Sequence, residues 1–278
     1  MKITVLIENT SLNDLACEHG LSLLIEYNDK KYLLDTGASD AFLDNAKALS
    51  IDVNDVECSV LSHGHFDHSG GYHTYLKDND VKVYAMKNAF CENCGIEHRR
   101  VSYIGIPKEV EKDFKDRFVL VDEITQIQDD VYIVPHSTPD LKQLGKRYDM
   151  YVLNENGYMY DDFSHELSLV FDTKNGLVIF NSCSHAGIQN IIHEVKNALP
   201  DKKIYAYFGG LHMYGEENGE IICTFSDEEV KAMSDFLIDE DVHVLYTGHC
   251  TGNPAYLKLK EHLGDKVKLL STGMNINL

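Results

Sequence analysis

The order of short apolar segments and amphipathic segments most constrains the fold of this 278-residue chain. In the first half, runs with strand character precede a helical pattern, and the same order returns in the second half. Two αβ halves of similar length predict an α/β fold in which two sheets pack face to face with helices outside. The predicted strands are 2–7, 21–26, 31–35, 58–61, 167–172, 176–180, 204–208, 243–246 and 267–270, and the predicted helices are 39–49, 187–199, 226–238 and 254–263.

Local signals refine this pattern. Asn28-Asp29 lies between two strand-like runs and predicts a hairpin turn, and Ser39 is the expected helix cap. Residues from approximately 87 to 165 do not follow the strand and helix order. We therefore expect a single domain over 1–278 with an insertion over about 87–165 near the active site.

Charge and composition limit the partners that we expect. A formal net charge of −20 argues against nucleic acid, because proteins that bind the phosphate backbone carry basic faces. No apolar run is long enough for a bilayer span, and seven scattered cysteines are typical of reduced thiols, so we expect a cytoplasmic protein without a membrane partner. The expected partner is a small, anionic substrate attracted by local cations or bound metal, and a homodimer is left open.

One short segment concentrates potential metal ligands. His63-Gly64-His65-Phe66-Asp67-His68 follows the predicted strand 58–61 directly. Imidazole and carboxylate groups suit zinc, iron or manganese, whereas magnesium and calcium prefer oxygen ligands alone. His185 and His249 each follow a later predicted strand and precede a predicted helix. The sequence therefore predicts a metal site built from several loops at strand ends.

These motifs resemble the metallo-β-lactamase superfamily across nearly the whole chain. The resemblance rests on the His-x-His-x-Asp-His run at 63–68, on Leu34-Asp35-Thr36-Gly37 and on the later isolated histidines. It implies a four-layer αββα sandwich. Further segments resemble the branch named for 7,8-dihydropterin-6-methyl-4-(β-D-ribofuranosyl)-aminobenzene-5′-phosphate synthase. These segments are Glu8-Asn9-Thr10, Glu18-His19-Gly20-Leu21, Cys183-Ser184-His185-Ala186-Gly187, Phe208-Gly209-Gly210-Leu211-His212 and His249-Cys250-Thr251-Gly252.

The resemblance also implies roles for individual residues. One metal ion would be held by His63, His65 and His185, and a second by Asp67, His68 and His249. Asp35 would support the metal-binding loop by hydrogen bonding without binding metal.

The chain departs from the superfamily pattern at the loop after strand 204–208. That loop normally supplies an aspartate that bridges the two metals, but here it reads Gly209-Gly210-Leu211-His212. We expect His212 to replace the aspartate, either as a ligand of the second metal or as a proton donor beside it. Whether the resting protein holds one ion or two is left open, because Asp67 alone would offset the metal charge.

Other residues give weaker signals. His19, Arg99, Arg100, Tyr103 and His165 are candidate substrate contacts. The two histidines are as compatible with an ordinary structural position, and paired arginines are usually part of a solvated face. Cys91 and Cys94 are compatible with a structural metal or a redox pair but are expected to be buried thiols, and packing is the expected role of Cys183 and Cys250.

The expected function is a metal-dependent hydrolase or transferase acting on a small phosphorylated or ester-containing metabolite. One or two divalent ions, with zinc expected and iron or manganese as alternatives, would supply metal-bound hydroxide or Lewis-acid chemistry. Asp67 and His212 are the expected catalytic residues. A pterin-related synthase activity is implied by the branch name. The rival interpretations are a non-catalytic metal-dependent sensor and a di-iron oxidoreductase.

Overall fold

The computed structural model describes residues 1–97 and 100–278, which form two compact units. The first unit consists of Met1–Asp122, Ser137–Leu167 and Ser271–Leu278. The second consists of Glu123–His136 and Ser168–Leu270. Each unit is therefore assembled from segments that are distant in the sequence.

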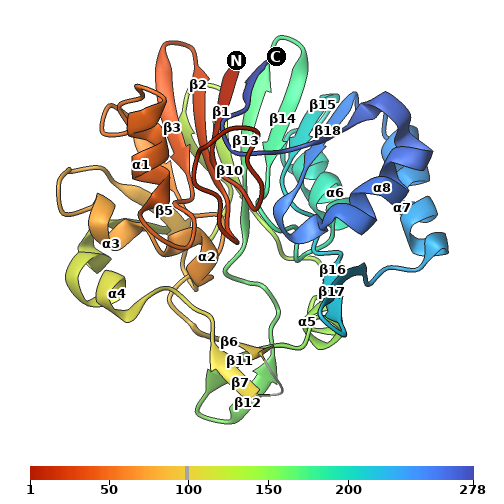
Figure 1. The fold of residues 1–278 in the computed structure, drawn as a ribbon, viewed down its shortest axis with the longest axis horizontal. Coiled ribbons are helices and arrows are strands. Elements are labelled where there is room, and N and C mark those ends of the chain that lie inside the picture. The colour runs from red at the N-terminus through yellow and green to blue at the C-terminus, as the bar shows by residue number, and fades with distance from the viewer. Residues whose placement is uncertain (98–99) are drawn as a thin grey trace. The chain divides into compact units, whose positions relative to one another are not determined.

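A seven-stranded mixed sheet forms the centre of the first unit (Figure 1). At one edge of this sheet the two ends of the chain, Lys2–Ile7 and Asn275–Asn277, pair in antiparallel fashion. In sheet order the strands are β20 (Asn275–Asn277), β1 (Lys2–Ile7), β2 (Ser22–Tyr27), β3 (Lys30–Leu34), β4 (Cys58–Val60), β5 (Val83–Met86) and β8 (Phe118–Val121).

The predicted hairpin and first helix are present, with one difference. Asn28 and Asp29 both have positive φ, as a two-residue hairpin turn requires. The helix α1 (Ala41–Ala48) packs against β1. The prediction of Ser39 as its cap is wrong, because Asp40 occupies the cap position and the Ser39 hydroxyl donates to Glu18 Oε2 (2.7 Å).

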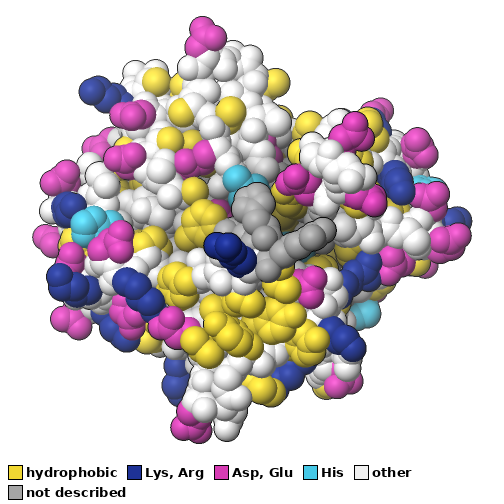
Figure 2. Space-filling model, turned by 60° about the horizontal axis from the view of Figure 1, so that its bottom comes forward, with side chains coloured by type: hydrophobic (Ala, Val, Ile, Leu, Met, Phe, Trp, Pro, Cys, Tyr) yellow, Lys and Arg dark blue, Asp and Glu magenta, His cyan; other side chains and the backbone are white. Residues whose placement is uncertain are grey.

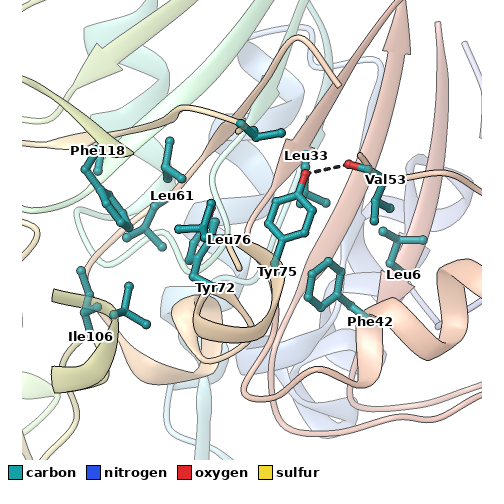
Figure 3. Packing of buried hydrophobic residues seen from close by; sticks show 14 of the residues in the cluster. Leu6, Leu33, Phe42, Val53, Leu61, Tyr72, Tyr75, Leu76, Ile106 and Phe118 are labelled. Carbon is teal, nitrogen blue, oxygen red and sulfur yellow. Dashed lines mark hydrogen bonds between the residues drawn. The ribbon is translucent and has the colours of Figure 1, made fainter. Parts of the chain in front are cut away.

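The core of the first unit packs aromatic rings between this sheet and its helices. Figure 3 shows Phe42, Tyr72 and Tyr75 among aliphatic side chains from several strands. The Tyr75 hydroxyl donates to the Val53 carbonyl at 2.6 Å, so its polar end is satisfied although the ring is buried. The remaining helices of this unit are α2 (Phe66–Ser69), α3 (Tyr72–Tyr75), α4 (Lys108–Phe114), α5 (Lys142–Arg147) and the 3-10 turn η1 (Lys115–Arg117).

A four-stranded antiparallel sheet also belongs to the first unit. In sheet order its strands are β12 (Gly157–Tyr160), β11 (Met150–Asn154), β6 (Glu92–Glu97) and β7 (Arg100–Tyr103). Hydrophobic side chains gather on its exposed surface (Figure 2), among them Ile96, Val101, Leu153 and Tyr158.

A second seven-stranded sheet forms the centre of the second unit. Its strands in order are β19 (Val267–Leu269), β18 (Val244–Thr247), β15 (Ile204–Phe208), β14 (Gly176–Phe180), β13 (Leu167–Thr173), β10 (Val131–Pro135) and β9 (Thr125–Gln128). Its helices and turns are α6 (Ile188–Ala198), α7 (Asp227–Asp239), α8 (Asn253–Leu263), η2 (His249–Thr251) and η3 (Gly264–Lys266), and β16 (Tyr214–Glu217) and β17 (Glu220–Cys223) form a separate hairpin.

The core of the second unit follows the predicted periodicity. In α6 the residues at one-turn spacing, Ile188, Ile191, Ile192 and Val195, are buried. Ser226 and Glu229 form a reciprocal capping box at the start of α7.

The predicted continuous insertion over 87–165 differs from the structure. β8 pairs with β5 in the first main sheet, while β9 and β10 belong to the second. Only the segments that form β6, β7, β11 and β12 build a separate sheet. Which sheet each strand joins depends on pairing with strands that are distant in the sequence, and local periodicity does not reveal these partners.

None of the helices in the described part of the chain is both long and apolar enough to cross a lipid bilayer.

Candidate metal centre

The His63–His68 loop begins where β4 ends, as the sequence predicts. β4 lies between parallel neighbours β3 and β5, so the loop leaves at the carboxyl end of a buried strand. The His63, His65, Asp67 and His68 side chains are buried. The ring centroid of His63 lies 4.6 Å from that of His65 and 4.2 Å from that of His68. Three imidazoles and a carboxylate thus lie together, which is a donor set that suits zinc or another transition metal.

Hydrogen bonds fix the orientation of two of these imidazoles. The buried Asp35 carboxylate accepts from the Ser62 amide (2.7 Å) and hydroxyl (2.7 Å) and binds His68 Nδ1 (2.8 Å). The Ser62 hydroxyl also lies 2.8 Å from His63 Nδ1. Because Nδ1 of each ring is engaged by a neighbouring group, Nε2 is the nitrogen that would bind a metal. The supporting role expected for Asp35 is consistent with these contacts.

The charges around His68 also fit a bound cation. Burial alone lowers the pKa of His68, but the nearby Asp67 and Asp35 carboxylates outweigh burial and raise this pKa to about 10. Carboxylates that stabilise a proton on a buried imidazole would stabilise a metal ion in its place.

His19 lies beside Asp67. Its Nε2 is 3.4 Å from Asp67 Oδ2, and its Nδ1 lies 3.3 Å from Asn9 Nδ2. The neighbouring Gly20 permits this approach, because a Cβ there would lie 2.6 Å from the Asp67 carbonyl oxygen. The structure therefore brings this predicted substrate residue next to a predicted metal ligand, with the His19 side chain half exposed.

The predicted insertion holds the backbone of Gly64, the residue between His63 and His65. The Gly64 amide donates to His165 Nδ1 (3.1 Å), and Asn93 Nδ2 donates to the Gly64 carbonyl (2.8 Å). His165 Nε2 lies 3.0 Å from Asp161 Oδ2. His165 is fully buried and uses both ring nitrogens in these contacts. Its observed role is therefore to position the loop, and its substrate contact stays a prediction.

In the second unit, three loops that follow parallel strands carry the later histidines. His185 follows β14, His212 follows β15 and His249 follows β18, and these strands are neighbours in the sheet. The ring centroids of His185 and His212 are 4.6 Å apart. The carboxyl ends of parallel strands meet at one edge, which explains why residues far apart in the sequence meet here.

The backbone at these loops is strained. Ser184, His212 and His249 have φ of 54°, 47° and 47°, in the left-handed region that residues with a Cβ rarely adopt. Strain of this kind concentrates at functional sites. Burial, followed by the neighbouring imidazoles, lowers the pKa of His212 despite the opposing effect of Cys250. A neutral imidazole of this kind can bind a metal.

Two cysteines belong to the same group. A ligand atom of Cys183, one of His212 and one of Cys250 all lie within 4.8 Å of one another. Both thiols are buried and neither forms a disulfide. From the sequence, the expected role of these cysteines was packing. Their positions close to His185 and His249 in the sequence already indicated that they lie near predicted ligands.

The remaining predicted residues belong to the segment 91–103. Arg99 is outside the described residues, and Arg100 is exposed on β7. The Tyr103 hydroxyl donates to the Ile106 carbonyl (2.7 Å). Cys91 and Cys94 are free thiols, of which Cys94 is buried as expected and Cys91 is half-buried. Burial raises the pKa of Cys91 to about 12.

Comparison with known proteins shows what the chain is similar to. Residues 15–141 match the model of the metallo-β-lactamase superfamily. The chain is 27% identical over 269 residues to a 7,8-dihydropterin-6-methyl-4-(β-D-ribofuranosyl)-aminobenzene-5′-phosphate synthase of Methanocaldococcus jannaschii, covering 92% of this chain and 88% of that protein. A metal-dependent hydrolase of the β-lactamase superfamily superposes with a TM-score of 0.81 and 28% identity, covering 100% and 99% of the two chains.

More distant structures have the same fold. The zinc-bound PqqB protein of Methylobacterium extorquens gives a TM-score of 0.59 at 10% identity and covers 100% of both chains. The predicted α/β fold class is therefore confirmed, and residues 15–141 resemble the metallo-β-lactamase superfamily.

Proposed function

We propose that the protein is a metal-dependent hydrolase that acts on a small, anionic metabolite containing a phosphoryl or carboxyl ester. The observation that carries the proposal is the buried set of three imidazoles and one carboxylate at 63–68, with two rings oriented by Asp35 and Ser62. Oriented nitrogen donors beside a carboxylate are what a catalytic zinc site requires.

Each unit contains its own set of proposed ligands. In the first unit we propose His63, His65, Asp67 and His68 as ligands, and in the second unit His185, His212 and His249. One or two ions would be bound per chain, and zinc fits these donors best, with iron or manganese as alternatives. When bound, such an ion lowers the pKa of a coordinated water and polarises an ester oxygen.

The protein's own groups then have distinct tasks. Asp67 orients the attacking water and accepts its proton, and His19 beside it helps to position that carboxylate. His212, whose lowered pKa favours the neutral ring, binds metal or transfers a proton near the substrate. Because the chain carries a formal net charge of −20, an anionic substrate would be attracted by local cationic side chains or by bound metal.

A synthase is the second candidate function. The match to the pterin-related synthase extends over 92% of this chain, which favours a related condensation. In that reaction the metal would act as a Lewis acid, and the same ligands would serve. A sensor without catalysis and a di-iron oxidoreductase are weaker candidates. A di-iron oxidoreductase of this superfamily typically has glutamate at the position of His65.

Metal content and activity test the proposal together. Protein purified without added metal is analysed for bound elements and assayed against a panel of phosphoesters and carboxyl esters, and against a pterin with an aminobenzene ribosyl phosphate. We expect one to two transition-metal ions per chain and ester cleavage that is lost in Asp67→Asn. Asp78→Asn, an exposed carboxylate in the first unit, is the control.

The outcomes separate the candidates. Condensation without ester cleavage would favour the synthase, metal without either activity would favour the sensor, and redox-active iron would favour the oxidoreductase. Magnesium alone, or no bound metal, would overturn the metal centre itself.

A further inference from the structure

The loops of the second unit lack a carboxylate at the strand ends where the histidines lie. The segments 181–187, 209–213 and 248–252 contain no Asp or Glu. Asp201 precedes β15, and Asp227 is paired with Lys258 (2.6 Å) on the first turn of α7. His185, His212 and His249 are neutral donors when they bind metal, so they cannot offset the charge of a divalent ion.

Two thiols are the acidic groups that these loops do contain. Cys183 lies two residues before His185, and Cys250 directly follows His249. Both side chains are 3% exposed, and their sulfur atoms lie with a His212 nitrogen in a group whose members are within 4.8 Å of one another. Around a tetrahedral zinc ion, two thiolate sulfurs and one imidazole nitrogen would lie about 3.5 to 3.8 Å from one another. Only a small movement of these side chains would therefore be required.

Hydrogen bonds between the loops hold this group in place. The Gly210 amide donates to the Ser182 carbonyl (2.7 Å), and the Ser184 hydroxyl donates to the Gly210 carbonyl (2.6 Å). The Met213 amide donates to the Cys250 carbonyl (2.9 Å). All three loops are therefore linked by hydrogen bonds around the sulfur atoms, which limits the cost of ordering the ligands.

Glycine at 210 leaves room for one of the sulfurs. A Cβ at this position would collide with Cys250 Sγ, and it would lie 3.1 Å from the Ser182 carbonyl. The preceding Gly209 has φ 141°, and its Cβ would collide with the Asn181 carbonyl. The two glycines bring the His212 loop close to both cysteine loops, where the superfamily pattern would place an aspartate.

We propose that Cys183 and Cys250, together with His212, form a thiolate-containing metal subsite that takes the place of the missing bridging carboxylate. Each thiol that binds releases its proton to solvent as the sulfur-metal bond forms, so no oxidant or reductant takes part. Thiolate ligands select zinc, cadmium or cobalt over magnesium and manganese. This inference rests on the proposed metal-dependent function and names further ligands for it.

Cobalt substitution tests the subsite without an activity assay. The full chain is stripped of metal under reducing conditions and titrated with Co²⁺ alone. We expect the near-ultraviolet charge-transfer absorption of a sulfur-cobalt bond, in addition to the visible bands of a nitrogen- and oxygen-bound ion. Zinc should displace the cobalt, abolish this absorption and protect two thiols from alkylation.

Matched variants identify the sulfur atoms. Cys183→Ala and Cys250→Ala should each weaken the charge-transfer absorption and lower zinc affinity at least about tenfold, the lower limit for groups that support a metal site. Cys58→Ala removes an equally buried thiol from β4 and should change neither quantity.

The possible failures are distinguishable. If the wild-type protein binds cobalt in full stoichiometry without a charge-transfer band, the thiolate subsite is wrong while the metal centre stands. A Cys183–Cys250 disulfide after purification under reducing conditions would also overturn it. If no metal binds, the proposed function itself fails. The cobalt spectrum of the wild-type protein tests the thiolate subsite even if an alanine variant does not fold.

Discussion

At the scale of single residues, the Asp35 carboxylate shows how one buried charge organises a loop. Asp35 has a φ of 58° and lies between β3 and α1, where its carboxylate reaches Ser62 and His68. A buried carboxylate costs free energy unless it is well hydrogen bonded, and here it accepts bonds from both the backbone and the side chain of Ser62. The strained backbone directs this carboxylate toward the loop 63–68, where strain of this kind is typical of a functional site.

Replacing Asp35 with Asn should weaken metal binding about 10- to 100-fold, as expected for a group that supports a metal ligand. The amide keeps the shape, but its NH₂ group would favour a His68 ring with the proton on Nε2, the nitrogen that a metal needs. Zinc affinity measured by competition with a chelator provides the test, with Asp78→Asn as a control that removes an exposed charge. Unchanged affinity in Asp35→Asn would contradict the proposed orientation of His68.

The His212 side chain provides a second test at this scale. His212→Ala should lower activity far more than it lowers the free energy of unfolding, because His212 packs with ligand loops more than with the apolar core. His212→Asp should bind the second metal ion more tightly than His212→Ala, since it restores a negative charge there. Metal titration of the two variants compares them directly. Equal affinities would mean that this side chain does not lie at the metal.

At the scale of elements, the four-stranded sheet and the segment after it support the loop 63–68. Asn93 comes from β6, and His165 follows β12 after the Asp161 turn. The Phe66 amide also donates to the Ile104 carbonyl (2.9 Å), just beyond β7. These elements therefore contact the backbone of 64–66 at several points, so a change in the sheet would be transmitted to the ligands.

Two amide variants of His165 can distinguish the contributions of its two hydrogen bonds. The side-chain oxygen of Asn in His165→Asn can replace Nδ1 and accept from Gly64, whereas the amide of Gln in His165→Gln can replace Nε2 and donate to Asp161. Both remove similar packing volume. We expect His165→Asn to retain zinc affinity better than His165→Gln, by at least about tenfold. Equal losses of affinity and thermal stability would indicate that His165 acts through packing alone.

At the scale of the whole molecule, the chain passes repeatedly between its two units. It crosses from one to the other at 122–123, 136–137, 167–168 and 270–271. The predicted ligands are divided between the units, with 63–68 in the first and His185, His212 and His249 in the second. A metal ion held by side chains that only folding brings together would be bound by the folded chain and not by the unfolded chain, so its binding would be coupled to folding.

Metal removal should therefore lower the unfolding temperature. Zinc at 100 times its dissociation constant adds about 2.7 kcal/mol to the free energy of unfolding if the unfolded chain does not bind it. Thermal unfolding is measured after chelation, after zinc is restored, and with magnesium as a control. Recovery with zinc but not magnesium is the expected result. An unfolding temperature that is insensitive to zinc would contradict coupled binding and folding.

The sequence by itself predicted those features that depend on neighbouring residues. The strands at 2–7, 176–180 and 204–208 and the hairpin at Asn28-Asp29 are present as predicted, because periodicity and turn residues act locally. The same holds for the candidate ligands at 63–68, which are so close in the sequence that one loop at the end of β4 brings them together.

Tertiary structure decided what depends on long-range contacts. Residues 118–121 belong to the first main sheet because they pair with β5, and no local pattern distinguishes that strand from an inserted one. Likewise, Asn93 and His165 meet at Gly64, and Cys183 meets Cys250 beside His212, only after the sheets have formed. The sequence does not distinguish a cysteine or asparagine that packs in the core from one that contacts a functional site, because the role depends on neighbours that only folding brings close.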